Sequence, residues 1–319
     1  MRLGVTLPQT SHRYDLAKDV TAFARAAEEI GFDSLWAYER ILAPVDSSGE
    51  HGLYGIPDVP WPDAYAHTTD ALVTLTLAAA VTDRVELGTG VLIPGLHLPM
   101  RLARSIAALD AASGGRVIAG LGSGWSIDEF AATAPRPIAE RGAALDEFLD
   151  IAGEVWGPDP VSYTTERYQL VPSAVNPKPA RRVPVFLAAG NRRSWSRLAR
   201  RADGWLPFSD SPEQVSKRLD ALRAEAVEAG RDPSEIGCIF QVTPRGLAEV
   251  PSAGREPYTG SLRQVVEDVA ALGEAGVDHA YVTLASLAGS LSELVDLSGE
   301  WYAEAKAAGL TDSPETAKE

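Results

Sequence analysis

The chain has 319 residues, of which 45% are hydrophobic and 23% charged, a composition typical of an ordinary globular protein. Its formal net charge of -15 argues against nucleic acid or an anionic membrane surface as the main partner. The single cysteine, Cys238, excludes an intramolecular disulfide and a thiolate metal site, and its apolar neighbours indicate a core position. No stretch resembles a signal peptide or is apolar for long enough to span a membrane, so we expect a cytoplasmic protein.

Short apolar segments alternate with helical segments along the chain. The first helical segment, residues 16–30, has apolar residues at the spacing of one helix face, and Gly31 after it is typical of a helix end. Strands are predicted over residues 2–8, 32–38, 85–91, 116–121, 183–189, 204–207, 236–242 and 279–284. Further helices are predicted over residues 70–80, 97–112, 126–130, 140–156, 191–202, 212–229, 261–273 and 290–306.

The alternation itself indicates the fold. Strands that alternate with helices predict a parallel sheet. Eight such units favour a closed (β/α)8 barrel, the TIM barrel, over an open doubly wound sheet, because right-handed crossovers wrap the helices around the outside. We therefore expect one α/β barrel domain over residues 1–309, followed by a polar, flexible tail over residues 310–319.

Three segments interrupt the alternation and are interpreted as insertions, over residues 41–69, 157–182 and 243–260. The second contains an extended excursion, and the first is rich in glycine, proline and aromatic residues. A connection as long as the first is typical of a lid or a binding loop. Its aromatic residues either line a pocket or pin the loop to the rim of the barrel, and they are Tyr54, Trp61 and Tyr65.

The candidate site residues are those that follow the strands, because barrels of this kind bind ligands at the C-terminal ends of their strands. The chain shows no Walker motif, no HExxH and no His/Asp cluster with metal-ligand spacing, and its five histidines are scattered, so we expect no metal site. The candidates at the strand ends are Gln9, Tyr38, Glu39, Arg40, Thr89, Gly90, Val91, Gly122, Ser123, Gly124, Trp125, Ala189, Gly190 and Asn191.

Two of these strand ends are glycine-rich turns, around Gly90 and over residues 122–125. Glycine leaves the backbone bare, so that a flat or phosphorylated ligand can approach closely. The second turn differs from the GxGxxG of dinucleotide-binding folds, because Trp125 occupies the position of the third glycine. The glycines alone are equally compatible with tight packing.

The turn at Ala189, Gly190 and Asn191 leads into a predicted helix. A helix N-terminus presents free N–H groups and the positive end of a dipole, which suits a phosphate group. The helix carries arginines that either reinforce this site or form a solvated face, and the later ones are expected at the surface: Arg192, Arg193, Arg197, Arg200 and Arg201.

In order and spacing, these segments resemble the luciferase-like flavin and deazaflavin oxidoreductases over nearly the whole chain. The matching segments are residues 31–36, 84–91, 109–110, 113–116, 120–125, 129–130, 141–142, 189–191 and 201–205. The resemblance implies a (β/α)8 barrel that binds FMN or coenzyme F420 at its C-terminal face, in a protein that is commonly a homodimer. It also implies a non-prolyl cis peptide between Gly90 and Val91, against the central ring of the cofactor.

The same resemblance assigns roles to further residues. The turns at 122–125 and 189–191 would meet the ribityl chain and the phosphate of the cofactor. Where many relatives have an acidic residue followed by histidine, this chain has Glu39 and Arg40. Either Glu39 takes an acid/base role, or Arg40 holds an anionic group, or the two form structural salt bridges. Beside the cofactor we expect a small, partly apolar substrate, with Gln9, Tyr38 and Trp61 as candidate contacts.

The resemblance implies an oxidoreductase, and the leading hypothesis is hydride transfer between F420 and a small organic substrate. The arginines of the helix at 191–202 are placed to meet the anionic tail of that cofactor. The alternative is an FMN-dependent monooxygenase that uses O2 and reduced flavin from a partner reductase. A third possibility is a flavin-binding protein without turnover, suggested by the missing histidine.

Overall fold

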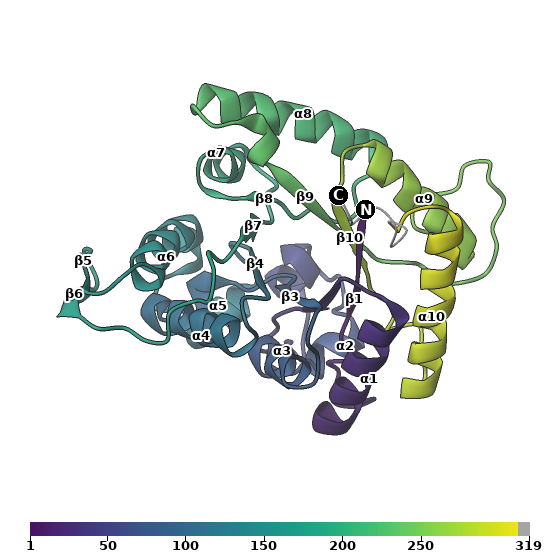
Figure 1. Cartoon of the computed structure of the whole chain (residues 1–319), viewed down its shortest axis with the longest axis horizontal. Helices are drawn as coiled ribbons and strands as arrows, with labels where there is room; N and C mark the ends of the chain where they lie inside the picture. Colours follow the sequence, from purple (N-terminus) through teal and green to yellow (C-terminus); the bar gives the residue numbers. More distant parts are fainter. Residues whose placement is uncertain (312–319) are drawn as a thin grey trace, which may run out of the picture.

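The computed structural model describes residues 1–311, and within them eight parallel strands close into a barrel (Figure 1). The order around the barrel is β1-β10-β9-β8-β7-β4-β3-β2, and β1 pairs with both β2 and β10. This closure confirms the predicted (β/α)8 barrel over the open sheet. The strands are β1 (Arg2–Thr6), β2 (Ser34–Ala37), β3 (Glu86–Thr89), β4 (Val117–Leu121), β7 (Val185–Leu187), β8 (Gly204–Trp205), β9 (Gly237–Val242) and β10 (His279–Val282).

Helices surround the strands, as Figure 1 shows. Many begin where a polar side chain accepts a hydrogen bond from the first turn, including those capped by Asp15, Asp70, Asn191, Ser211 and Ser261. No helix of the described residues is both long and apolar enough to cross a membrane. The helices are α1 (Leu16–Ile30), α2 (Asp63–Ala66), α3 (Ala71–Ala79), α4 (Pro99–Ala112), α5 (Ile127–Thr133), α6 (Arg141–Trp156), α7 (Arg192–Arg201), α8 (Pro212–Glu228), α9 (Leu262–Glu274) and α10 (Leu291–Ala307).

Side chains fill the interior of the barrel. Trp36 and Tyr281 stack with their ring centroids 4.2 Å apart, and the Trp36 indole donates a 2.7 Å hydrogen bond to Ser34 Oγ. A side chain at Gly88 would collide with the Trp36 ring, so glycine leaves the space that this large residue needs. A filled interior places any ligand above the ends of the strands. Cys238 lies in the main hydrophobic core with residues of both strands and helices, and its core position is as predicted.

Two insertions contain more structure than the sequence indicates. Residues 41–69 include the short turns η1 (Gly49–His51) and η2 (Leu53–Gly55) as well as α2, and an isolated bridge joins Thr10 to Thr68. The extended excursion in the second insertion is an antiparallel hairpin of β5 (Val161–Thr164) and β6 (Gln169–Ser173), which projects away from the barrel at the left of Figure 1.

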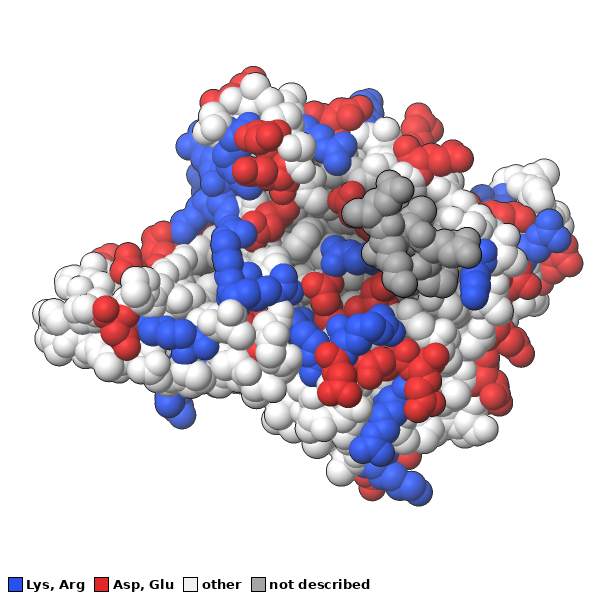
Figure 2. All heavy atoms as spheres, viewed as in Figure 1, with Lys and Arg blue, Asp and Glu red and all other residues white. Residues whose placement is uncertain are grey.

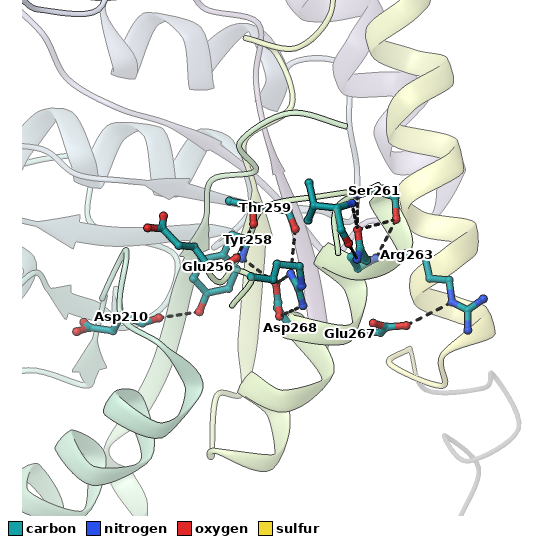
Figure 3. Close-up of polar contacts among 11 residues, drawn as sticks. Asp210, Glu256, Tyr258, Thr259, Ser261, Arg263, Glu267 and Asp268 are labelled. Carbon is teal, nitrogen blue, oxygen red and sulfur yellow. Dashed lines mark hydrogen bonds and ion pairs between the residues drawn. The ribbon is translucent and has the colours of Figure 1, made fainter. Parts of the chain in front are cut away.

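Two residues of α9 hold the third insertion, residues 243–260: Gln264 bonds to the Val250 backbone, and Asp268 bonds to Arg255 and Tyr258. Both carboxylate oxygens of Asp268 accept 2.7 Å hydrogen bonds from Arg255, and one also accepts from the Tyr258 backbone N–H. The Tyr258 hydroxyl donates to the Asp210 carbonyl at 2.7 Å, so that the insertion is also tied to the start of α8 (Figure 3). Of the predicted tail, residues 312–319 lie outside the described residues.

Candidate active site

The turn after β3 carries the cis peptide that the resemblance implies, between Gly90 and Val91. A side chain at Gly90 would collide with the Tyr281 hydroxyl, which donates a 3.0 Å hydrogen bond to Gln241 Oε1. Glycine is therefore required here by the filled barrel beneath the turn. Val91 is half-buried, so part of this turn remains accessible at the mouth of the barrel.

The end of β4 is locked against the end of β3. The buried Thr89 hydroxyl donates to the Gly120 carbonyl at 2.8 Å and accepts from the Gly120 N–H at 2.9 Å. Beyond them, the Gly122 N–H donates to the Leu92 carbonyl at 2.8 Å. Thr89 thus supports the turns through backbone contacts, and the two glycine-rich turns form one rigid surface.

Close packing also fixes the turn at residues 122–125. An added Cβ at Gly122 would lie 2.9 Å from Val91 Cγ2, and one at Gly124 would lie 2.7 Å from Ile93 Cγ2. Gly124 also has a φ of +77°, which favours glycine. Ser123 is half-buried beside them. The packing interpretation of these glycines is therefore confirmed, and the approach of a ligand to their backbone stays a prediction.

Glu39, at the end of β2, has both carboxylate oxygens occupied. Oε2 accepts a 2.7 Å hydrogen bond from the Ile93 N–H, and Oε1 lies 2.7 Å from His97 Nε2. Burial alone would lower the pKa of His97, but the hydrogen bond and charge of Glu39 outweigh it and raise that pKa. His97 was not predicted as a site residue, and it contacts a residue 58 positions away in the chain.

Arg40 turns to another partner. Its Nη1 lies 2.9 Å from Glu129 Oε2, and the Ile41 N–H donates to Glu129 Oε1 at 2.8 Å. The side chains are only 10% and 4% exposed, so this is a buried ion pair. Burial raises the pKa of Glu129, although the charge of Arg40 and the Ile41 N–H oppose that shift. Arg40 therefore forms a structural salt bridge, and its partner is Glu129.

The Arg40 guanidinium also packs against an aromatic cluster, which we define as Tyr54, Trp61, Tyr65 and Trp125. Its carbon lies 5.0 Å from the Trp125 ring centroid and 5.3 Å from that of Tyr65, within the range of cation–π attraction. The Trp61 and Trp125 centroids are 4.8 Å apart. The cluster thus joins the 41–69 loop to the glycine-rich turn after β4 and pins the loop there, whereas a role in lining a pocket stays a prediction.

Gln9 and Tyr38 connect the ends of β1 and β2. The buried Gln9 amide donates to the Tyr38 carbonyl at 2.7 Å and accepts from the Tyr38 N–H at 2.8 Å. Burial raises the pKa of the Tyr38 hydroxyl. The third predicted substrate contact, Trp61, donates its indole N–H to the His51 carbonyl at 2.8 Å. The side-chain N–H donors of Gln9 and Trp61 are thus bonded to backbone carbonyls of the protein itself.

The predicted phosphate turn lies next to the turn at 122–125, because the Ala188 N–H donates to the Leu121 carbonyl at 2.9 Å. Asn191 caps α7 and forms a capping box with Ser194, which also binds the Gly190 N–H. An added Cβ at Gly190 would meet no atom of the described chain within 4 Å, so the turn faces open space.

The arginines of α7 divide into two groups. Arg192 and Arg193 are exposed at the first turn, directly after the Asn191 cap. Arg197 was expected at the surface, but its side chain is 10% exposed, because it forms a 2.6 Å ion pair with Asp146 of α6. On the face seen in Figure 2, basic side chains gather over α7 beside acidic ones.

Comparisons with known proteins agree with this architecture. A family model described as luciferase-like monooxygenase matches residues 1–245. An uncharacterised protein of Mycobacterium tuberculosis is 34% identical over 255 residues, which cover 78% of this chain and 89% of that protein. An F420-dependent glucose-6-phosphate dehydrogenase of Amycolatopsis mediterranei is 31% identical over 230 residues, which cover 70% of this chain and 64% of that protein.

A solved structure extends the likeness in fold to almost the whole chain. A monooxygenase from Streptomyces bottropensis superimposes with a TM-score of 0.75 and 20% sequence identity, covering 98% of this chain and 100% of the other. At this identity the superposition shows the shared fold, and no more.

Proposed function

The chain belongs to the luciferase-like monooxygenase family and is an oxidoreductase, and we propose that it transfers a hydride between coenzyme F420 and a small organic molecule. Some of its relatives are named as F420-dependent dehydrogenases of small molecules, which supports a cofactor of the flavin or deazaflavin class for this chain. The observation that carries the F420 assignment is the 31% identity to an F420-dependent dehydrogenase over 70% of this chain.

The mouth of the barrel suits such a cofactor in shape and charge. The bare backbone at Gly90–Val91 and at residues 122–125 would support a flat ring and the ribityl chain. The turn at 189–191 opens to free space and leads into the N-terminus of α7, which suits the phosphate. Arg192 and Arg193 would face the anionic tail. When bound, the cofactor supplies a ring carbon that accepts or donates the hydride.

We assign different tasks to the two charged residues after β2. Arg40 has further N–H donors besides the one bonded to Glu129, and these can bind an oxygen of the substrate. The aromatic cluster around it excludes water and favours a partly apolar molecule. Glu39 acts as a positioning residue, because its bonds to the Ile93 N–H and to His97 hold the turn beneath the ring. Tyr38 lines the same rim.

The test is a direct comparison of cofactors. Purified protein is titrated with F420 and with FMN, and we expect the lower dissociation constant for F420. A double variant, Arg192→Ala with Arg193→Ala, should weaken F420 binding by about tenfold, because it removes charges near the phosphate turn. Arg200→Ala is the matched control, since Arg200 is exposed farther along the same helix. Tighter binding of FMN would overturn the F420 assignment.

The second candidate is an FMN-dependent monooxygenase, which the description of the matching family favours. That activity needs O2 and reduced flavin from a partner reductase. Oxygen consumption that depends on reduced FMN and on an added organic substrate would identify it. We further propose a cytoplasmic homodimer, which sedimentation of the purified protein would test.

A further inference from the structure

Three side chains with metal-binding atoms meet where the loop after β1 touches α2. They are His12, Asp63 and His67, and one ligand atom from each lies within 4.8 Å of the other two. His12 Nε2 is 3.4 Å from Asp63 Oδ2, and His67 Nε2 is 3.9 Å from Asp63 Oδ1. The site lies at the edge of the barrel mouth and is not part of the proposed cofactor surface.

The backbone holds these residues together independently of their side chains. Asp63 opens α2 and His67 follows its last residue, so the two lie four positions apart on one helix face. The Ser11 N–H and hydroxyl both bond to the His67 carbonyl, at 2.8 and 3.1 Å. The bridge between Thr10 and Thr68 continues this pairing. As a result, the His12 and His67 rings lie 4.3 Å apart.

We propose that His12, Asp63 and His67 bind one divalent transition-metal ion of the zinc class. Two imidazoles and one carboxylate are a ligand set that Zn²⁺ takes with water in the fourth position. In tetrahedral geometry such ligand atoms lie about 3.3 Å apart. The two histidines approach different oxygens of Asp63, at 3.4 and 3.9 Å, so a rotation of the carboxylate has to bring one oxygen to both imidazoles. All three side chains are reachable from solvent, which gives the ion an entry path.

One neighbouring group competes with the ion. The Arg13 Nε–H donates to His12 Nε2 at 3.2 Å. This bond requires Nε2 to carry its lone pair, and the same lone pair would bind the metal. Arg13 must therefore release His12, and its Nη1 already lies 3.4 Å from the Ser286 carbonyl and 3.5 Å from that of Ala288. Metal binding exchanges this one hydrogen bond for a coordinate bond.

The ion would join two separate segments of the rim. His12 belongs to the loop after β1, whereas Asp63 and His67 belong to the 41–69 loop. Trp61 and Tyr65 of the aromatic cluster lie within two residues of these ligands in the chain. A metal at this point therefore fastens the 41–69 loop over the mouth of the barrel.

The binding test uses the full chain without an affinity tag. Calorimetric titration with Zn²⁺ should show one equivalent bound, and Co²⁺ should give visible absorption from protein ligands. His12→Gln and His67→Gln should each weaken Zn²⁺ binding by at least about tenfold. His51→Gln is the matched control, because His51 lies in the same loop but bonds to Asp128. Thermal melting of each variant verifies that it is folded.

The outcomes separate clearly. Absence of a one-equivalent Zn²⁺ isotherm would overturn the site, and so would equal binding in His12→Gln, His67→Gln and the wild type. Fastening of the loop has its own measurement: hydrogen–deuterium exchange over residues 61–68 should slow on adding Zn²⁺ in the wild type and not in His12→Gln. Unchanged exchange in the wild type with Zn²⁺ bound would contradict the fastening.

Discussion

Glu39 and Arg40 are neighbours in the chain, but their side chains contact different parts of the molecule. Glu39 is bonded to the turn after β3, whereas Arg40 reaches Glu129 on α5 and the aromatic cluster. Each of the two has its own partner, His97 for Glu39 and Glu129 for Arg40. Removing Glu39 or Arg40 therefore leaves that partner without its opposite charge. The two roles can therefore be tested one residue at a time.

The variant Glu39→Gln keeps the side-chain shape but removes the charge beside His97. We expect the pKa of His97 to fall and stability to drop by about 1–3 kcal/mol. Because the folded wild type raises this pKa, the stabilisation is full below the unfolded pKa and is lost as pH rises through the folded pKa. In urea unfolding, the difference in free energy of unfolding between the two proteins should therefore become smaller as the pH rises. A difference in free energy of unfolding that stays constant with pH would mean that the bond between Glu39 and His97 contributes nothing to stability.

The glycine-rich turns were predictable from the sequence, because closely packed turns require glycine. At Gly90 a side chain would collide with the Tyr281 hydroxyl. Contacts between side chains far apart in the chain could not be predicted in this way. His97 reaches Glu39 only because the turn after β3 folds back over β2. Likewise, the spacing of Asp63 and His67 is visible in the sequence, but the approach of His12 depends on tertiary pairing.

Among the elements, periodic segments were predicted well and irregular ones were not. The long amphipathic helices α1 and α6 were predicted within a residue at each end, because one face of each packs on the barrel. Strands were predicted too long, and β8 retains only Gly204–Trp205. The 41–69 loop has positive φ angles at Tyr54 and Asp58, a local geometry that no periodic pattern encodes.

Asp268 and Gln264 both attach the 243–260 insertion to α9, and Asp268 supplies the charged contact. Asp268→Asn should lower the free energy of unfolding by about 3 kcal/mol, because it leaves Arg255 largely buried without its charged partner. Glu267→Gln is the matched control next to it in Figure 3, since its pair with Arg263 is exposed and contributes little. Urea unfolding measures both variants. Equal unfolding midpoints for the two would contradict the anchoring role of Asp268.

At the scale of the whole molecule, the fold was predictable because the same strand–helix unit recurs along the entire chain. Closure follows from the pairing of β1 with β10, which joins the first strand of the chain to the last. The packing inside the barrel was not predicted. Its central stack of Trp36 on Tyr281 depends on glycines of neighbouring strands, and this complementarity is a property of the closed barrel.

The barrel interior also sets a limit on stability in acid. Burial lowers the pKa of His279 to about 3, and this residue contacts Ser34 Oγ at 2.7 Å. Because the unfolded chain binds this proton near pH 6.5, stability should fall by about 1.4 kcal/mol per pH unit from there towards pH 3. His279→Gln should show a shallower decline in urea unfolding across that range, with His51→Gln as the exposed control. Parallel curves for His279→Gln and the wild type would refute this contribution.

The 41–69 loop lies outside the strand pairing of the barrel, and within the described residues it is attached by side chains and by the bridge at Thr68. Replacing a surface loop costs little in closure entropy, so the eight strands would keep their register around a different segment. The loop nevertheless supplies most of the aromatic wall above the proposed redox surface. Under the proposed function, we expect substrate preference to change when another segment is grafted between Arg40 and Asp70 onto the unchanged barrel.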